Sequence, residues 1–154
     1  GFGCGTNTGA RNTMTIPLSG FLTPKSGVVK SSLSVFAGEG DKGATGDHLS
    51  LTDINGASHF IANSLNPYDD IFNSTITYNG TTVTDTTTPV AITPYYSSNS
   101  NGIDIDTFDV SKDKDNIPLI TNNQTSTNIT LDTDGDGSMP GIFAFKTDLF
   151  TPKF

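Results

Sequence analysis

The chain has 154 residues, a formal net charge of −8, one cysteine and no tryptophan. This length suits one domain with a single core, and the acidic balance argues against nucleic acid or an anionic membrane surface as a partner, because both select clustered lysine and arginine. A single cysteine excludes an internal disulfide, and no run approaches the roughly eighteen apolar residues that insertion of a helix into a membrane requires.

The first twelve residues, GFGCGTNTGARN, contain four glycines and show no hydrophobic period. We therefore expect residues 1–12 to form a leader that is flexible or held by a partner. Cys4 within it is predicted to be a free thiol or to bond to another chain. Residues 13–154 are predicted to form one domain.

The next stretch is a strand with one apolar face, because Met14, Ile16 and Leu18 alternate with polar residues and Pro17. Pro17 lacks a backbone N–H, so the strand belongs at the edge of a sheet. Two interpretations follow. It is an ordinary edge strand, or it crosses to a neighbouring copy, where the three apolar side chains fill pockets and main-chain hydrogen bonds supply the affinity.

Short runs of alternating or β-branched residues, separated by turns, continue to the end of the chain. We expect strands over residues 33–37, 49–51, 59–62, 72–78 and 81–84, near 103–110 and 119–120, and over 129–131 and 143–150. Asn79-Gly80 is a strong signal for a tight hairpin turn. No stretch of ten or more residues has a 3.6-residue apolar stripe, so little or no helix is expected. The pattern predicts an all-β fold of two packed antiparallel sheets, a jelly-roll or immunoglobulin-like sandwich, with a closed barrel as the alternative.

The loop Asp132-Thr-Asp134-Gly-Asp136-Gly places carboxylates at alternate positions and glycines where the backbone must fold back. Hard cations such as Ca²⁺ take six to eight oxygen ligands. The three carboxylates would supply part of this set, and a backbone carbonyl and water would complete it. Asp132, Asp134 and Asp136 are therefore candidate Ca²⁺ ligands, and Asp104, Asp106 or Asp109 could add further oxygens. A plain turn rich in Asp and Gly is the alternative interpretation. An EF-hand loop would carry a glutamate at its twelfth position, where this chain has Phe143.

Catalytic signals are weak, and we expect the chain not to be an enzyme. Neither His48 nor His59 belongs to a motif that contains a nucleophile. Carbohydrate binding is a stronger rival to a structural role, because exposed tyrosines can stack on sugar rings. Tyr95 and Tyr96 are the candidate stacking residues, with Tyr68 and Tyr78 as further platforms. Four Asn-X-Ser/Thr sites are candidates for glycosylation, at Asn73, Asn79, Asn123 and Asn128.

Five segments together resemble a module of large secreted prokaryotic surface proteins that often precedes stalks of immunoglobulin-like repeats. They are SGFLTP at 19–24, AGEGDKGATGD at 37–47, LNPYDDIFNSTI at 65–76, GIDID at 102–106 and GDGSMPGIFAFKTDLFTPK at 135–153. The resemblance implies a secreted, cell-surface location and an adhesin-like or fibre-forming role. Only Gly135-Asp136 of the acidic loop belongs to the pattern of that module, so Asp132 and Asp134 are a departure from it.

These observations predict an extracellular structural protein that assembles with copies of itself into a surface filament or sheath. The glycine-rich leader and the strand with Pro17 are the expected means of joining, and Ca²⁺ would stiffen loops or joints. A glycan-binding adhesin module and a passive spacer in a longer polypeptide are the alternatives.

Overall fold

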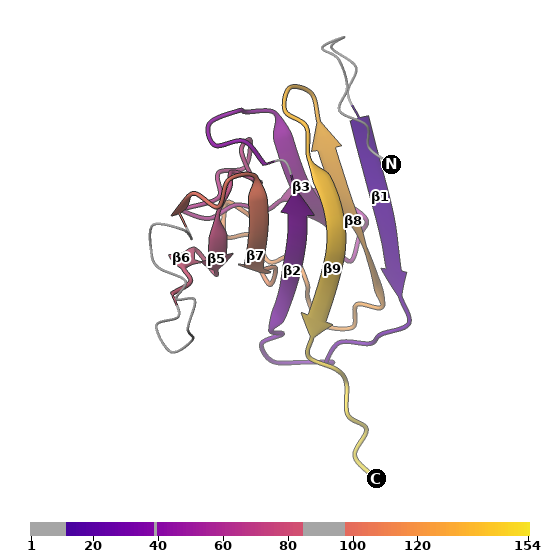
Figure 1. Ribbon diagram of the computed structural model, residues 1–154. Helices are drawn as coiled ribbons and strands as arrows, with labels where there is room; N and C mark the ends of the chain where they lie inside the picture. Colours follow the sequence, from indigo (N-terminus) through magenta and orange to yellow (C-terminus); the bar gives the residue numbers. More distant parts are fainter. Residues whose placement is uncertain (1–11, 39, 85–97) are drawn as a thin grey trace.

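A computed structural model describes residues 12–38, 40–84 and 98–154, and over these ranges its regular elements are β-strands (Figure 1). The strands are β1 (Asn12–Ser19), β2 (Ser31–Gly38), β3 (Asp47–Thr52), β4 (Ser58–Phe60), β5 (Ile76–Tyr78), β6 (Thr81–Thr82), β7 (Ile103–Asp109), β8 (Ser126–Thr133) and β9 (Met139–Thr147). Asn12, which the sequence placed in the leader, is the first residue of β1. The rest of the predicted leader, including Cys4, lies outside the described residues.

The strands form two sheets. A four-stranded sheet has the order β1-β8-β3-β4, and a five-stranded sheet has the order β6-β5-β7-β2-β9. The predicted all-β fold of two sheets is confirmed. One pair departs from the antiparallel pattern, because β5 runs parallel to β7.

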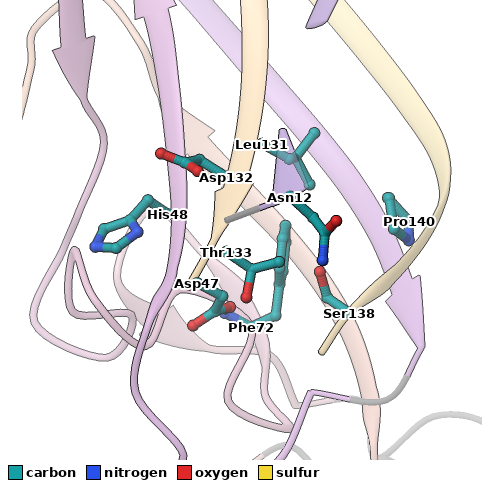
Figure 2. Close-up of a pocket in the computed structure, with 9 residues that line it drawn as sticks. All are labelled: Asn12, Asp47, His48, Phe72, Leu131, Asp132, Thr133, Ser138 and Pro140. Carbon is teal, nitrogen blue, oxygen red and sulfur yellow. The ribbon is translucent and has the colours of Figure 1, made fainter. Parts of the chain in front are cut away.

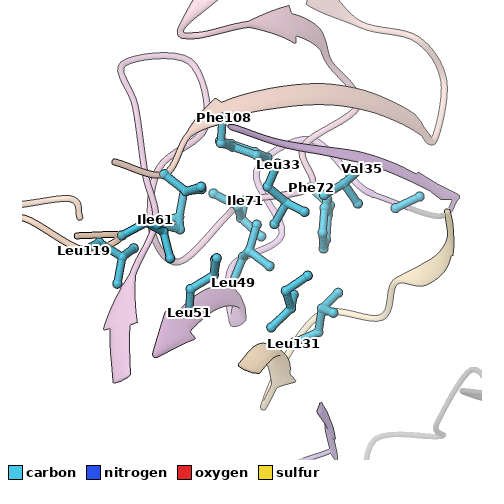
Figure 3. Packing of buried hydrophobic residues seen from close by; sticks show 14 of the residues in the cluster. Leu33, Val35, Leu49, Leu51, Ile61, Ile71, Phe72, Phe108, Leu119 and Leu131 are labelled. Carbon is cyan, nitrogen blue, oxygen red and sulfur yellow. The ribbon is translucent and has the colours of Figure 1, made fainter. Parts of the chain in front are cut away.

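The core lies between the two sheets, where alternate residues of the long strands are buried (Figure 3). In β2, Leu33, Val35 and Ala37 point inward, and the residues between them point outward. The two-residue period of a strand produces this division directly. The remaining core side chains come from β3, β7, β8 and the segments between strands: Val29, Leu49, Leu51, Ile61, Ile71, Phe72, Phe108, Val110, Leu119, Ile120, Ile129 and Leu131.

Strand β1 is an edge strand that pairs along all eight residues with β8 of its own chain, from Asn12 opposite Thr133 to Ser19 opposite Ser126. Met14, Ile16 and Leu18 are partly buried against the core. The edge position agrees with the one predicted from Pro17, whose missing N–H a central strand would need.

The predicted hairpin at Asn79-Gly80 is confirmed, since β5 pairs antiparallel with β6 across this turn, with positive φ at both residues. The predicted strand over 72–78 is wrong for its first four residues. Residues 71–75 are irregular and buried, and they run through the interior. Ser74 has a φ of 60°, a left-handed conformation that a strand does not contain. No strand forms at 119–120, where the chain makes only an isolated bridge between Lys112 and Pro118.

Candidate functional site

Three buried carboxylates hold the interior segment 71–77. The first, Asp47, opens β3 and is 1% exposed. Its Oδ2 accepts the backbone N–H of Phe72 at 2.8 Å, and its Oδ1 accepts that of Ile71 at 3.2 Å. Residues outside a regular ladder must find other partners for their backbone groups. Asp47 supplies these partners at the start of the interior segment.

The other two carboxylates come from β7, whose polar face is turned inward. Asp104 and Asp106 are 0% and 1% exposed. The Oδ1 of Asp104 accepts the backbone N–H of Thr75 at 3.0 Å, and the Oδ1 of Asp106 accepts that of Thr77 at 3.0 Å. The hydroxyl of Thr77 also donates to Asp106, at 2.6 Å. The parallel pairing of β5 with β7 places these carboxylates beside the segment that they bind.

Polar side chains of the same region complete the network. Asn66 is fully buried, and its Nδ2 donates to Thr75 Oγ1 at 2.9 Å and to the carbonyl of Ile71 at 3.3 Å. Ser74 donates to the carbonyl of Gly40, which ties the network to the loop before β3. Such networks rigidify a core when their members are satisfied.

Burial raises the pKa of Asp47 and of Asp104 to about 7, and that of Asp106 to about 6. Removal from water disfavours the charged carboxylate, and the N–H and O–H donors only partly compensate. The Oδ2 atoms of Asp104 and Asp106 are buried without a hydrogen-bond partner. At neutral pH a substantial fraction of Asp47 and Asp104 is therefore protonated, whereas Asp106 is mostly ionised.

The three predicted Ca²⁺ ligands lie at the end of β8 and in the loop that follows it. Asp132 lies in β8 and accepts a hydrogen bond from Thr13 Oγ1 at 3.2 Å. Asp134 is exposed on the β8–β9 loop, and Asp136 is partly buried behind it. Within the described part of the chain, no three or more His, Cys, Asp or Glu side chains are grouped to hold a metal ion. Ca²⁺ binding by this loop stays a prediction.

A small cavity lies beside this loop, between β1, β3, β8 and the start of β9 (Figure 2). Its volume is about 10 Å³, which is room for about one water molecule. In Figure 2, Asp47 and Thr133 lie beside Phe72, while His48 and Asp132 lie on the other side of the strands. The cavity is too small for an organic substrate.

A larger groove of about 500 Å³ lies at the opposite end of the five-stranded sheet. Its lining includes Lys30, Lys112 and Lys146, together with Tyr78 and Asp109. Among the described residues, none of these three ammonium groups forms an ion pair. Asp148 also lines the groove, so lysines slightly outnumber aspartates there, in a chain whose net charge is −8.

The remaining predicted residues fall in different places. Tyr95 and Tyr96 lie outside the described residues. Asn73 is 7% exposed, and its amide donates to the carbonyl of Leu65 at 2.8 Å, which leaves no room for a glycan on the folded chain. The other three candidate glycosylation residues, Asn79, Asn123 and Asn128, are exposed.

Sequence reasoning missed an ion-pair cluster around His59. Its Nδ1 lies 2.8 Å from Asp113 Oδ2, and its Nε2 lies 3.0 Å from Asp53 Oδ2. Each aspartate begins a turn and uses its Oδ1 to accept two backbone N–H groups of that turn. The only signal in the sequence was the pair of similar turns, DINGA and DKDNI.

No family model matches the chain, and neither curated proteins nor solved structures give a match. Over the residues that the structure describes, no helix is long and apolar enough to cross a membrane.

Proposed function

We propose that the chain is an extracellular structural protein that assembles with copies of itself into a surface filament or sheath. The observation that carries the proposal is the position of β1. It pairs with β8 alone, at the edge of a sheet, and contributes three partly buried apolar side chains to the core. An edge strand of this kind can be exchanged for the same strand of another copy, with the same hydrogen bonds and the same pockets.

The extracellular part of the proposal rests on the resemblance of five segments to a module of secreted surface proteins. The structural role is supported by where the buried acids act. Asp47, Asp104 and Asp106 bind backbone N–H groups of their own chain, so their chemistry is used to hold the interior segment.

Calcium is the proposed stiffening ion, with Asp132, Asp134 and Asp136 as candidate ligands. Burial and the neighbouring charges of Asp41 and Asp70 raise the pKa of Asp136, and its Oδ2 has no hydrogen-bond partner. A bound cation would relieve both effects. Equilibrium dialysis with Ca²⁺, with the Asp134→Asn/Asp136→Asn variant as control, tests this part separately.

A glycan-binding adhesin module is the second candidate. Tyr78 is 59% exposed and lines the 500 Å³ groove beside polar side chains, as a stacking platform for a sugar ring would. This candidate predicts a monomer that binds sugars on a glycan array.

A disulfide trap between β1 and β8 tests strand exchange. Thr15 lies directly opposite Thr130, and their hydroxyl oxygens are 3.1 Å apart. We would replace both by cysteine in a Cys4→Ser background. Assembled and oxidised material should give a ladder of covalent oligomers on a non-reducing gel and a single band after reduction, because each β1 would be bonded to the β8 of another copy.

The Thr15→Cys variant alone is the control, since it cannot link more than two copies. If the double variant assembles but contains only disulfides within one chain, strand exchange is wrong. If the protein stays monomeric at every concentration, the proposal of a self-assembling subunit is wrong as well.

A further inference from the structure

The two ends of the molecule differ in charge. Strand β2 begins after Lys30, and its second residue, Ser32, lies opposite Lys146 of β9. It ends at Gly38, opposite Met139, where the loop before β3 and the β8–β9 loop meet (Figure 1). Lysines therefore gather at the end where β2 starts, and the acidic loops lie at the end where it finishes.

The acidic end is built from three loops held together by backbone hydrogen bonds. Gly46 donates to the carbonyl of Asp69 at 2.7 Å and accepts from the N–H of Asp134 at 2.9 Å. These contacts collect the side chains of Asp41, Asp69, Asp70, Asp134 and Asp136, together with Lys42, whose positive charge acts on Asp70. Burial raises the pKa of Asp136, and the negative charges of Asp41 and Asp70 raise it further.

The lysine end is the 500 Å³ groove lined by Lys30, Lys112 and Lys146. Two aspartates also line it, and each keeps its negative charge while it accepts a backbone hydrogen bond, so the groove sets three ammonium groups against two carboxylates. Asp148 accepts the N–H of Lys30 at 2.9 Å, and Asp109 accepts that of Ser111 at 2.8 Å. The lysine ammonium groups have no ion-pair partner in the described part of the chain, so they are available to an external anion.

We propose that this groove is the docking site for the acidic end of a second copy, with the tip of its β8–β9 loop, around Asp134, facing the three lysines. The occupant is argued from charge complementarity, because the acidic loops are exposed at the opposite end of the same molecule. The inference rests on the proposed self-assembly and adds a second contact between copies to the exchange of β1.

A contact between opposite ends is heterologous. A row of docked copies then has a free groove at one end and a free acidic tip at the other. It grows into an open filament unless the rotation between neighbouring copies closes a ring. The contact differs from exchange of β1, because it needs no strand to leave its own sheet. Attraction between charges at a surface is screened by salt, so assembly should weaken as NaCl rises from about 0.05 to 0.5 M.

Charge swapping tests the proposal. A groove variant carries Lys30→Glu, Lys112→Glu and Lys146→Glu, and a tip variant carries Asp41→Lys and Asp134→Lys, both exposed positions. Each variant alone opposes like charges across the contact, and the concentration for half-assembly should rise by about 100-fold or more. An equimolar mixture restores opposite charges at every contact and should assemble, which sedimentation velocity and electron microscopy would show.

Circular dichroism and thermal unfolding would establish that both variants are folded, and recovery of assembly in the mixture is itself evidence of this. Lys153→Glu, an exposed charge reversal outside the groove, is the control and should assemble as the unchanged chain does.

If the groove variant alone assembles normally, the docking contact is wrong and the proposed function stands. If the unchanged chain never assembles, both are wrong. In that case, binding of alginate, an acidic polysaccharide, could be measured on the monomer. If the unchanged chain binds alginate and the groove variant does not, the groove is a site for an acidic saccharide instead.

Discussion

The carboxylate of Asp47 accepts the backbone N–H of Phe72 at 2.8 Å and thereby joins β3 to the segment that runs through the interior. The same side chain accepts the N–H of Ile71. One side chain at the start of a strand thus replaces the ladder partners that two buried residues lack. The fold depends on this contact because residues 71–75 are buried without belonging to a sheet.

Replacement of Asp47 by alanine should lower the free energy of unfolding by about 2–4 kcal/mol, because two buried N–H groups lose their acceptors. Chemical denaturation at pH 7 would measure this. Asp115→Ala is the control, since Asp115 is exposed and forms only a surface ion pair with Lys114, and it should leave stability unchanged. Equal stability of the Asp47→Ala variant and the unchanged chain would contradict the role assigned to Asp47.

The second prediction concerns the pH dependence of stability through Asp104. Its pKa in the folded chain is about 7, against an ordinary value of 3.8. Between these values the folded chain holds a proton that the unfolded chain has released, so stability falls as pH rises from about 4 to 7. Asp47 and Asp106 act in the same direction.

Asp104→Asn should remove part of this dependence. Asparagine keeps an acceptor for the N–H of Thr75 and carries no charge at either pH. We expect the variant to match the unchanged chain at pH 5 and to exceed it by about 1–3 kcal/mol at pH 8. Thermal unfolding at both pH values is the measurement. A variant equally destabilised at pH 5 and pH 8 would show that the carboxylate is needed for a reason other than its proton.

The third prediction concerns Gly40, which packs against the same network. A Cβ there would collide with Asp104 Oδ2 and with the backbone carbonyl of Phe72. Gly40→Ala should therefore destabilise the fold by about 1–3 kcal/mol, the usual cost of overpacking. Gly137→Ala is the matched control, because Gly137 has open space around it and no positive φ. Similar unfolding midpoints for the two variants would contradict the close packing around Gly40.

Local patterns in the sequence predicted the elements whose partners are also regular strands. Alternation around Leu33 and Val35 and around Leu49 and Leu51 predicted two strands, and the structure confirms both strands and the burial of these four side chains. Ser50, which was expected on the polar face of its strand, is buried as well. Asn79-Gly80 predicted its hairpin because the backbone conformation of a tight turn depends on those two residues themselves. Each of these signals is contained within a few neighbouring residues.

The interior segment and the candidate site could not be predicted in this way. Alternation of Ile103, Asp104, Ile105 and Asp106 identifies a strand, yet it does not say which face is turned inward. Here the aspartates are buried, while Ile103 and Ile105 are 42% and 46% exposed. The reason lies in residues 71–77, which are distant in sequence and need acceptors for their N–H groups. The residues that form this irregular segment, Asn73, Ser74 and Thr75, also fit the pattern of a strand. Only tertiary contacts therefore decide between a strand and an irregular interior segment.

The last prediction concerns His59, which bridges two turns through Asp53 and Asp113. The bond to Asp113 is the largest cause that raises the pKa of His59. Burial opposes it, and the bond to Asp53 then raises the pKa further, so the net shift is upward. A raised pKa in the folded chain means that the imidazolium stabilises the fold fully below the ordinary pKa near 6.5, and that this contribution is lost as pH rises through the folded value.

His59→Gln removes the charge and keeps a polar side chain, so the unchanged chain should exceed the variant in unfolding temperature by most at pH 5 and by least at pH 8. Asp53→Asn is the matched control. It removes one of the two charges that face the ring and should reduce the pH dependence without abolishing it. The unfolding temperatures of all three chains would be measured from pH 5 to pH 8. If the difference between the unchanged chain and His59→Gln stays constant over this range, His59 acts through neutral hydrogen bonds alone.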